Sequence, residues 1–148
     1  MIASADCYVS LHRAEGFGHT IAEALALGTP VIATGASGNL EYMDAEMAHL
    51  VGAAPAPVSR GVDPYDAGAM WFEPDLDHAA LLMRRVWENP SEARRRAAFG
   101  RRRILTEHGR AAAIRTITQR VAAIEERRLA GYESRVAEHV RLLNIPDW

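Results

Sequence analysis

The sequence predicts an α/β fold in which a parallel sheet is followed by a helical C-terminal region, and three observations lead to that prediction. Before residue 74, short apolar runs alternate with glycine and proline. Two of these runs flank a helical pattern within about 30 residues, which is the βαβ unit of a parallel sheet. After residue 74, apolar residues recur at helical spacing almost to the end of the 148-residue chain. A chain of this length has enough residues to bury a core.

The first βαβ unit is expected between residues 7 and 34. Residues 7–11 are rich in strand formers and predict a short buried strand. Residues 19–27 predict a helix that ends at Gly28, because glycine is the usual residue just past a helix end. Residues 30–34 predict the next strand, with Pro30 at its first position, where no ladder donor is lost.

The next segment predicts a turn, a weaker strand and a long loop. Residues 35–38 are expected to turn, and Asn39 is expected to cap a short helix through Met43. Residues 49–51 predict a third strand. Residues 53–72 contain three prolines and predict a long loop. Three strands are fewer than a typical sheet holds, so we expect further strands upstream or in another chain.

Helices are expected from residue 75 onward. Asp75 is expected to cap a helix that runs to Glu88, where Pro90 interrupts the pattern. Ser91 is expected to start another helix that ends near Gly109. Beyond it, two groups of apolar residues recur at spacings of three and four, with a shift of phase between them, and either cover the sheet or bind a partner. The groups are Ile114, Ile117, Val121 and Ile124, then Tyr132, Val136, Val140 and Leu143.

The composition excludes several kinds of chemistry. All 17 basic residues are arginine, which excludes Schiff-base chemistry and a Walker-type phosphate-binding lysine within this chain. The single cysteine, Cys7, excludes an internal disulfide framework and favours the cytoplasm. Histidine spacing resembles no metal site, and we expect no metal. Asp6 and Arg13 interrupt any early apolar region, so no signal peptide is expected. The longest uncharged run, residues 24–40, contains Pro30 and several glycines and is not expected to span a membrane.

Charge is divided unevenly along the chain. Residues 1–82 contain two arginines against eleven acids, whereas residues 83–148 contain fifteen arginines against eight acids. No aromatic residues alternate with the arginines as they would in a surface that stacks nucleic-acid bases. We therefore expect solvated helices and no nucleic-acid partner, while contact with a membrane surface stays open.

The residues between Glu15 and Glu41 predict an anion-binding site. A strand end, a loop with Gly16 and Gly18, and a helix start follow one another here. Backbone N–H groups point out of a helix start, and glycine lets a ligand approach the chain closely. In α/β sheets ligands bind at the carboxyl ends of the strands, and a diphosphate is the ligand that we expect here. Glu15 in the loop and Glu23 one turn inside the helix would accept hydrogen bonds from ligand hydroxyls.

This segment resembles the retaining glycosyltransferases of the GT-B fold, specifically family 4 (group 1). The resemblance rests on Glu15-Gly16-Phe17-Gly18, on Glu23 eight positions after Glu15, and on the two runs Gly28-Thr29-Pro30-Val31-Ile32 and Gly38-Asn39-Leu40-Glu41. It continues through residues 71–75 and fades near Gly109. It implies that residues 1–109 are a partial, Rossmann-like nucleotide-sugar-binding domain, the second half of a GT-B C-terminal domain. Residues 110–148 would then be a C-terminal helical extension.

The resemblance also implies roles for individual residues. Glu15 would be the catalytic residue that contacts hydroxyls of the donor sugar, and Glu23 would hold the ribose. The substrate-binding residues between them would act chiefly through backbone N–H groups; they are Phe17, Gly18, His19, Thr20 and Ile21. Further possible site residues are Gly16, Asn39, Glu41 and Arg13. Ordinary structural roles are the alternatives for Phe17, Asn39, Glu41 and Arg13.

The reaction implied by the resemblance is transfer of a sugar from a nucleoside diphosphate sugar to an acceptor hydroxyl with retention, without metal or other cofactor. The family's donor site includes an arginine and a lysine that this chain lacks, so we expect the isolated chain to be inactive. Its partner would be an N-terminal acceptor domain or a separately encoded half. Two alternatives stay open: a non-catalytic nucleotide-binding or helical docking module of a split enzyme, and a degenerate protein that keeps the fold without binding nucleotide.

Overall fold

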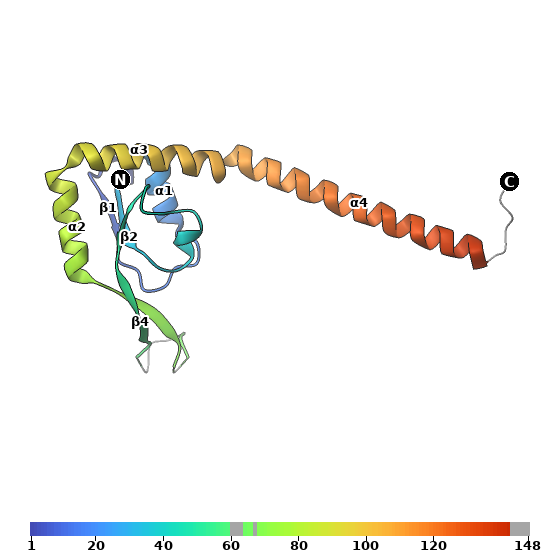
Figure 1. The fold of residues 1–148 in the computed structure, drawn as a ribbon, viewed down its shortest axis with the longest axis horizontal. Coiled ribbons are helices and arrows are strands. Elements are labelled where there is room, and N and C mark those ends of the chain that lie inside the picture. Colours follow the sequence, from blue (N-terminus) through green and yellow to red (C-terminus); the bar gives the residue numbers. More distant parts are fainter. Residues whose placement is uncertain (60–63, 67, 143–148) are drawn as a thin grey trace. The chain divides into compact units, whose positions relative to one another are not determined.

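The computed structural model describes residues 1–59, 64–66 and 68–142, and its fold is drawn in Figure 1. A first compact unit spans Met1–His108, and a second begins at Gly109. After a short 3₁₀ turn, η1 (Ile2–Ser4), the first unit forms a parallel sheet in the order β1-β2-β3. The strands are β1 (Tyr8–Ser10), β2 (Val31–Thr34) and β3 (His49–Val51). The predicted α/β fold, a parallel sheet followed by helices, is confirmed.

Helix α1 (His19–Leu27) connects β1 to β2, as the glycine pattern predicts. It ends at Gly28, whose φ of 77° lies in the left-handed region that glycine occupies without strain. The N–H of Gly28 donates to the carbonyl of Leu25, and that of Thr29 to the carbonyl of Ala24. These two bonds satisfy carbonyl groups that the helix itself leaves unpaired.

Helices cover both faces of the sheet. Successive residues of a strand point to opposite faces, so Val31 and Ala33 pack with α1 and α3 (Pro90–Glu107), while Ile32 packs with α2 (Leu76–Glu88). All four residues of β2 are buried, as expected for the central strand of a parallel sheet.

The boundaries of the two covering helices follow their capping residues. The Asp75 carboxylate accepts a hydrogen bond from the N–H of His78, which confirms the predicted cap of α2. Helix α3 begins at Pro90, one residue before the predicted start at Ser91. Proline fits the first helical position because the N–H that it lacks would have no partner there.

The long loop predicted over residues 53–72 is wrong. Strands β4 (Ala53–Pro57) and β5 (Met70–Pro74) form an antiparallel ribbon in which Pro55 lies opposite Phe72 and Pro57 opposite Met70. The N–H of Phe72 donates to the carbonyl of Arg13, so at this pair the backbone donors point away from the opposing strand. Pro57 lies two residues after Pro55, so its backbone nitrogen points away from β5 as well. Neither proline therefore removes a hydrogen bond between the two strands.

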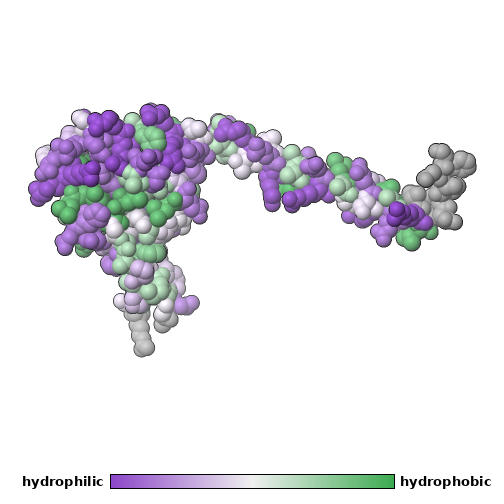
Figure 2. Space-filling model, in the orientation of Figure 1, coloured by the Kyte–Doolittle hydropathy of each residue, from purple (hydrophilic) through white to green (hydrophobic). Residues whose placement is uncertain are grey.

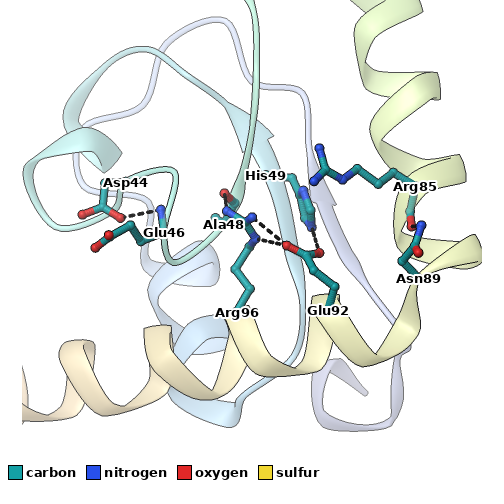
Figure 3. A network of polar contacts seen from close by, with 8 residues as sticks. All are labelled: Asp44, Glu46, Ala48, His49, Arg85, Asn89, Glu92 and Arg96. Atoms are coloured by element: carbon teal, nitrogen blue, oxygen red, sulfur yellow. Dashed lines mark hydrogen bonds and ion pairs between the residues drawn. The ribbon is translucent and has the colours of Figure 1, made fainter.

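A polar network ties the amino end of β3 to α3 (Figure 3). The Glu92 carboxylate accepts hydrogen bonds from Arg96 Nε at 3.0 Å and Nη2 at 2.6 Å. Its other oxygen lies 3.6 Å from Nε2 of His49, which is too far for a hydrogen bond. Burial of the His49 ring lowers its pKa, and the positive charge of Arg96 lowers it further. Both effects favour the neutral form of the His49 ring.

The second unit consists of one helix in the part that the structure describes, α4 (Arg110–Leu142). The described apolar residues of the two predicted groups are half-exposed, and so is Leu129, which lies between the groups. We call the stripe from Ile114 to Val136 the apolar seam. The side chain of Val140, and Leu143 as a whole, lie outside the described residues. None of the described helices is long and apolar enough to cross a membrane.

Candidate functional site

The candidate site lies at the carboxyl edge of the sheet, where the loop after β1 meets the turn after β2. The N–H of Gly38 donates to the carbonyl of Glu15 at 3.1 Å. A Cβ atom at Gly38 would overlap the carbonyl oxygen of Gly16. The two loops therefore pack backbone against backbone, and only glycine fits at position 38.

The N-terminus of α1 opens at this edge. Gly18 is the N-cap residue, and its φ of 81° and ψ of 54° place it in the left-handed region. No described side chain caps the helix, and the first intrahelical bond joins the N–H of Ala22 to the carbonyl of Gly18. The backbone N–H groups of His19, Thr20 and Ile21 thus have no acceptor among the described residues. Together with the helix dipole they make a binding position for an anion.

Tyr42 packs against the loop that contains Gly16 and Gly18, which we call the glycine loop. Its hydroxyl donates a hydrogen bond of 2.8 Å to the carbonyl of Gly18, and its ring centroid lies 4.8 Å from that of Phe17. Burial raises the pKa of the tyrosine to about 12, and the negative charge of Glu15 adds to this effect. Phe17 also lies near His19 and His108, with centroids 5.1 and 6.4 Å away. The predicted ligand contact Phe17 is thus also part of an aromatic cluster.

Two carboxylates flank the helix start. Glu15 is half-buried and lies beside Gly18, since a Cβ atom built there would be 3.2 Å from Glu15 Cγ. Glu23 is exposed, four residues after His19 on the same face of α1. Neither carboxylate makes a hydrogen bond or ion pair with any described residue, so both are free to accept hydrogen bonds from a ligand.

Two other predicted site residues, Thr20 and Ile21, lie in the first turn of α1. The Ile21 side chain is fully buried in the core. The Thr20 hydroxyl accepts a hydrogen bond of 2.8 Å from the hydroxyl of Tyr8. Both residues present their amide N–H groups at the helix start, and their contact with phosphates stays a prediction.

The predicted role of Asn39 as a helix cap is wrong. Asn39 lies within a 3₁₀ turn, η2 (Gly38–Glu41), and its side chain is fully buried. Its amide donates to the carbonyl of Thr34 at 3.0 Å, and its oxygen lies 3.1 Å from Nε2 of His12. The Glu41 carboxylate, by contrast, is exposed. Asn39 therefore holds the turn to the sheet with its side chain directed inward.

His12 joins the end of β1 to the turn after β2. Its Nδ1 lies 3.1 Å from the Ser10 hydroxyl, and its Nε2 lies 3.2 Å from the carbonyl oxygen of Ala36. With the proton on Nε2, the ring donates to that carbonyl and accepts a hydrogen bond from Ser10. The ring thus fixes the relative position of the two loops that form the site.

Arg13, a possible anion contact from the sequence, is held by the ribbon. Its Nε and Nη2 donate to the two carboxylate oxygens of Glu73 at 2.6 and 2.7 Å, and its guanidinium lies 5.1 Å above the Trp71 ring. Hydrogen bonding from Arg13 lowers the pKa of Glu73. In this arrangement the guanidinium neutralises a carboxylate of the protein and attaches β5 to the site loop.

Ser37 is a site feature that the sequence reasoning missed. Its φ of 76° and ψ of −165° are a conformation that is costly for a residue other than glycine. Its hydroxyl is buried without a hydrogen-bond partner among the described residues. Nothing in the local sequence marks such strain. Tyr42 was missed for a similar reason, because its contact with Gly18 joins residues 24 positions apart.

Comparison with known families finds a match at the beginning of the chain. Residues 1–59 match the family described as "Glycosyl transferases group 1", which is about two fifths of the chain. The matched segment contains every residue singled out as a candidate for the site. No curated protein matches the chain. The family match supports glycosyl transfer as the chemistry to which this segment is related.

Proposed function

We propose that residues 1–109 are the second half of the donor-binding domain of a retaining, family 4 glycosyltransferase of the GT-B fold. One observation carries the proposal: three unpaired backbone N–H groups at the start of α1 lie between two carboxylates, Glu15 and Glu23, that have no partner among the described residues. Amides suit a diphosphate and carboxylates suit sugar hydroxyls, so the arrangement matches the two parts of a nucleoside diphosphate sugar.

The spacing along α1 supports the assignment of each residue. Four residues of helix span about 6 Å, so Glu23 lies one turn beyond the amides of His19 and Thr20 on the same face. A diphosphate on those amides would place a ribose within reach of Glu23. Glu15, on the loop side of the helix start, would then contact hydroxyls of the donor sugar and act as the catalytic residue.

The proposed chemistry is electrostatic positioning. The leaving diphosphate would take the proton of the acceptor hydroxyl on the face from which it departs, so no protein nucleophile, metal or other cofactor is required. Helix-start amides aimed at the phosphates stabilise the charge that develops there. The proposal places the protein in the cytoplasm, which the single cysteine favours.

The residues around the start of α1 do not supply enough positive charge to neutralise a diphosphate. Arg13 is the nearest arginine in the sequence to the glycine loop, and it is paired with Glu73. We therefore propose that basic residues and an acceptor domain from outside this chain complete the enzyme, and that the isolated chain is inactive. The missing basic residues and acceptor domain come either from the same polypeptide or from a separately encoded half.

The outer edge of β1, which no described strand covers, favours a second candidate, a module that completes a split glycosyltransferase. The N–H of Tyr8 donates to Pro30, so by alternation the N–H and carbonyl of Val9 point away from β2. A groove of about 700 Å³ follows this edge, and Trp87 beside it is 85% exposed. A parallel strand from a second polypeptide would pair with Val9 and cover this apolar groove.

Calorimetric titration of the purified chain with UDP, GDP and ADP tests the donor site. We expect binding of one of these nucleotides, weakened roughly tenfold by Glu23→Ala, because a hydrogen bond to a charged group contributes about 1.5 kcal/mol or more. Glu88→Ala removes an exposed acid on α2 and is the matched control, with unchanged binding expected. A folded chain that binds none of the three nucleotides contradicts the proposal and favours a degenerate protein. Glycosyl transfer by the chain alone contradicts the expected inactivity.

A further inference from the structure

Helix α4 has an apolar seam along the length that the structure describes. Its first group has spacings of three, four and three residues and comprises Ile114, Ile117, Val121 and Ile124. Its second group continues the pattern with Leu129, Tyr132 and Val136. These side chains are 43% to 62% exposed, and Figure 2 shows apolar patches recurring along this helix. A 33-residue helix with such a stripe gains stability by packing the stripe against another helix.

Charged residues of opposite sign border the two sides of the seam. With Val121 at position a of a heptad, Arg120 takes position g and Glu125 position e. With Leu129 at position a, Arg128 takes position g and Glu133 position e. Arginine thus lies on one flank of the seam and glutamate on the other, in both halves of the helix.

This distribution of charge selects one orientation for a partner with the same sequence. In a parallel pair of helices, position g of one chain faces position e of the next heptad in the other, which brings Arg120 to Glu125 and Arg128 to Glu133. In an antiparallel pair, g faces g and e faces e. That arrangement would place arginine against arginine and glutamate against glutamate, which is destabilising.

We propose that α4 binds a second copy of this chain as a parallel, in-register coiled coil through the seam from Ile114 to Val136. The heptad pattern shifts by one residue between Ile124 and Leu129. When the two helices are in register, this shift occurs at the same level in both copies. β-Branched residues at position a suit two strands, and isoleucine at position d suits three, so the assembly contains two or three chains. This inference does not depend on the proposed donor site, because no residue of that site takes part in it.

Sedimentation equilibrium of the full chain tests the association. We expect two or three times the 16.2 kDa mass of the chain. Arg120→Glu/Arg128→Glu places glutamate opposite Glu125 and Glu133 of the second copy and is expected to weaken self-association at least tenfold. Glu125→Arg/Glu133→Arg makes both flanks basic, with the same expected effect, and an equimolar mixture of the two variants should associate again. Circular dichroism of each variant checks that α4 is still helical.

Matched controls place the same charge changes away from the seam. Arg115→Glu/Arg141→Glu and Glu126→Arg/Glu138→Arg alter positions b, c and f, and we expect association to be unchanged. A monomeric wild-type chain at micromolar concentrations overturns the proposal. Association that the flank variants leave unaltered also overturns it.

Disulfide cross-linking tests the orientation. In a Cys7→Ser background, Val121→Cys should form a cross-linked dimer on mild oxidation, because equivalent a positions face each other only in a parallel, in-register pair. Gln119→Cys, at the outward position f, is the control and should not cross-link. An associating Val121→Cys protein that fails to cross-link overturns the parallel arrangement.

Discussion

Gly38 and Gly131 show how differently the two units of this protein use their backbone. Gly38 lies where two loops touch, and a Cβ atom there would overlap the Gly16 carbonyl. Gly131 lies within α4, and the nearest atom to an added Cβ atom is in the exposed guanidinium of Arg135, 3.8 Å away. The site loops are fixed by contacts between distant segments, whereas the backbone of α4 makes its hydrogen bonds between residues close together in the chain. The same glycine-to-alanine substitution should therefore have opposite effects in the two regions.

Gly38→Ala is expected to have the largest effect. The new Cβ must displace the site loop, and we expect a loss of about 3 kcal/mol or more in the free energy of unfolding, together with loss of nucleotide binding. Urea denaturation and nucleotide titration measure the two effects. Gly16→Ala is the matched control, because a Cβ atom at position 16 meets no atom within 4 Å. Equal stability of the two variants would show that the loops do not pack as closely as described.

This contrast also explains what the sequence could and could not predict. The strand, glycine loop and helix from Tyr8 to Gly28 follow from residues close together in the chain, and their prediction is confirmed. The ribbon was missed because proline argues against a strand. Pro55 and Pro57 fit only because both lie in the phase whose donors point outward. That phase depends on register with a strand more than ten residues away.

The supports of the candidate site were missed for a related reason. A tyrosine at position 42 and a histidine at position 12 have no local pattern that indicates a contact with Gly18 or Asn39. Asn39 was expected to cap a helix because asparagine commonly does so. Its buried bonds to Thr34 and His12 prevail, since the side chain loses all contact with water at that position and requires partners there. Local rules therefore indicated where the candidate site lies, whereas long-range packing determines which side chains support it.

The free energy of unfolding should depend on pH because of His49, which is buried in the first unit. The pKa of His49 is lowered in the folded state, so between the unfolded value of 6.5 and its folded pKa only the unfolded chain binds this proton. Stability is therefore expected to fall as the pH decreases through that window, by at most about 1.4 kcal/mol per pH unit for one group.

The variant His49→Gln isolates this contribution. We expect its free energy of unfolding to be flatter than that of the wild type just below pH 6.5, as measured by urea denaturation at a series of pH values. Hydrogen bonding from Arg96 lowers the pKa of Glu92, whose contribution is lost only at more acidic pH. Identical slopes for the variant and the wild type would mean that His49 titrates normally in the folded protein.

Removal of one hydroxyl from each unit sharpens the comparison further. Tyr42→Phe deletes the hydrogen bond to the Gly18 carbonyl and is expected to cost about 1 kcal/mol of stability and to weaken nucleotide binding. Tyr132→Phe, on the exposed seam of α4, is the matched control and should leave both properties unchanged. If both variants bind nucleotide equally well, Tyr42 does not position the glycine loop for binding.

Gly131→Ala is expected to produce the smallest effect and the one of opposite sign. Alanine in the interior of a helix is favoured over glycine by about 0.5–1 kcal/mol, and no neighbouring atom obstructs its methyl group. The variant should show a higher helical signal in circular dichroism and a higher midpoint for melting of α4, with nucleotide binding unchanged. Position 131 lies outside the seam and its charged flanks, so self-association should also be unaltered. A destabilised α4 would mean that another backbone approaches Gly131 closely, which a parallel pair joined through Ile114 to Val136 does not require.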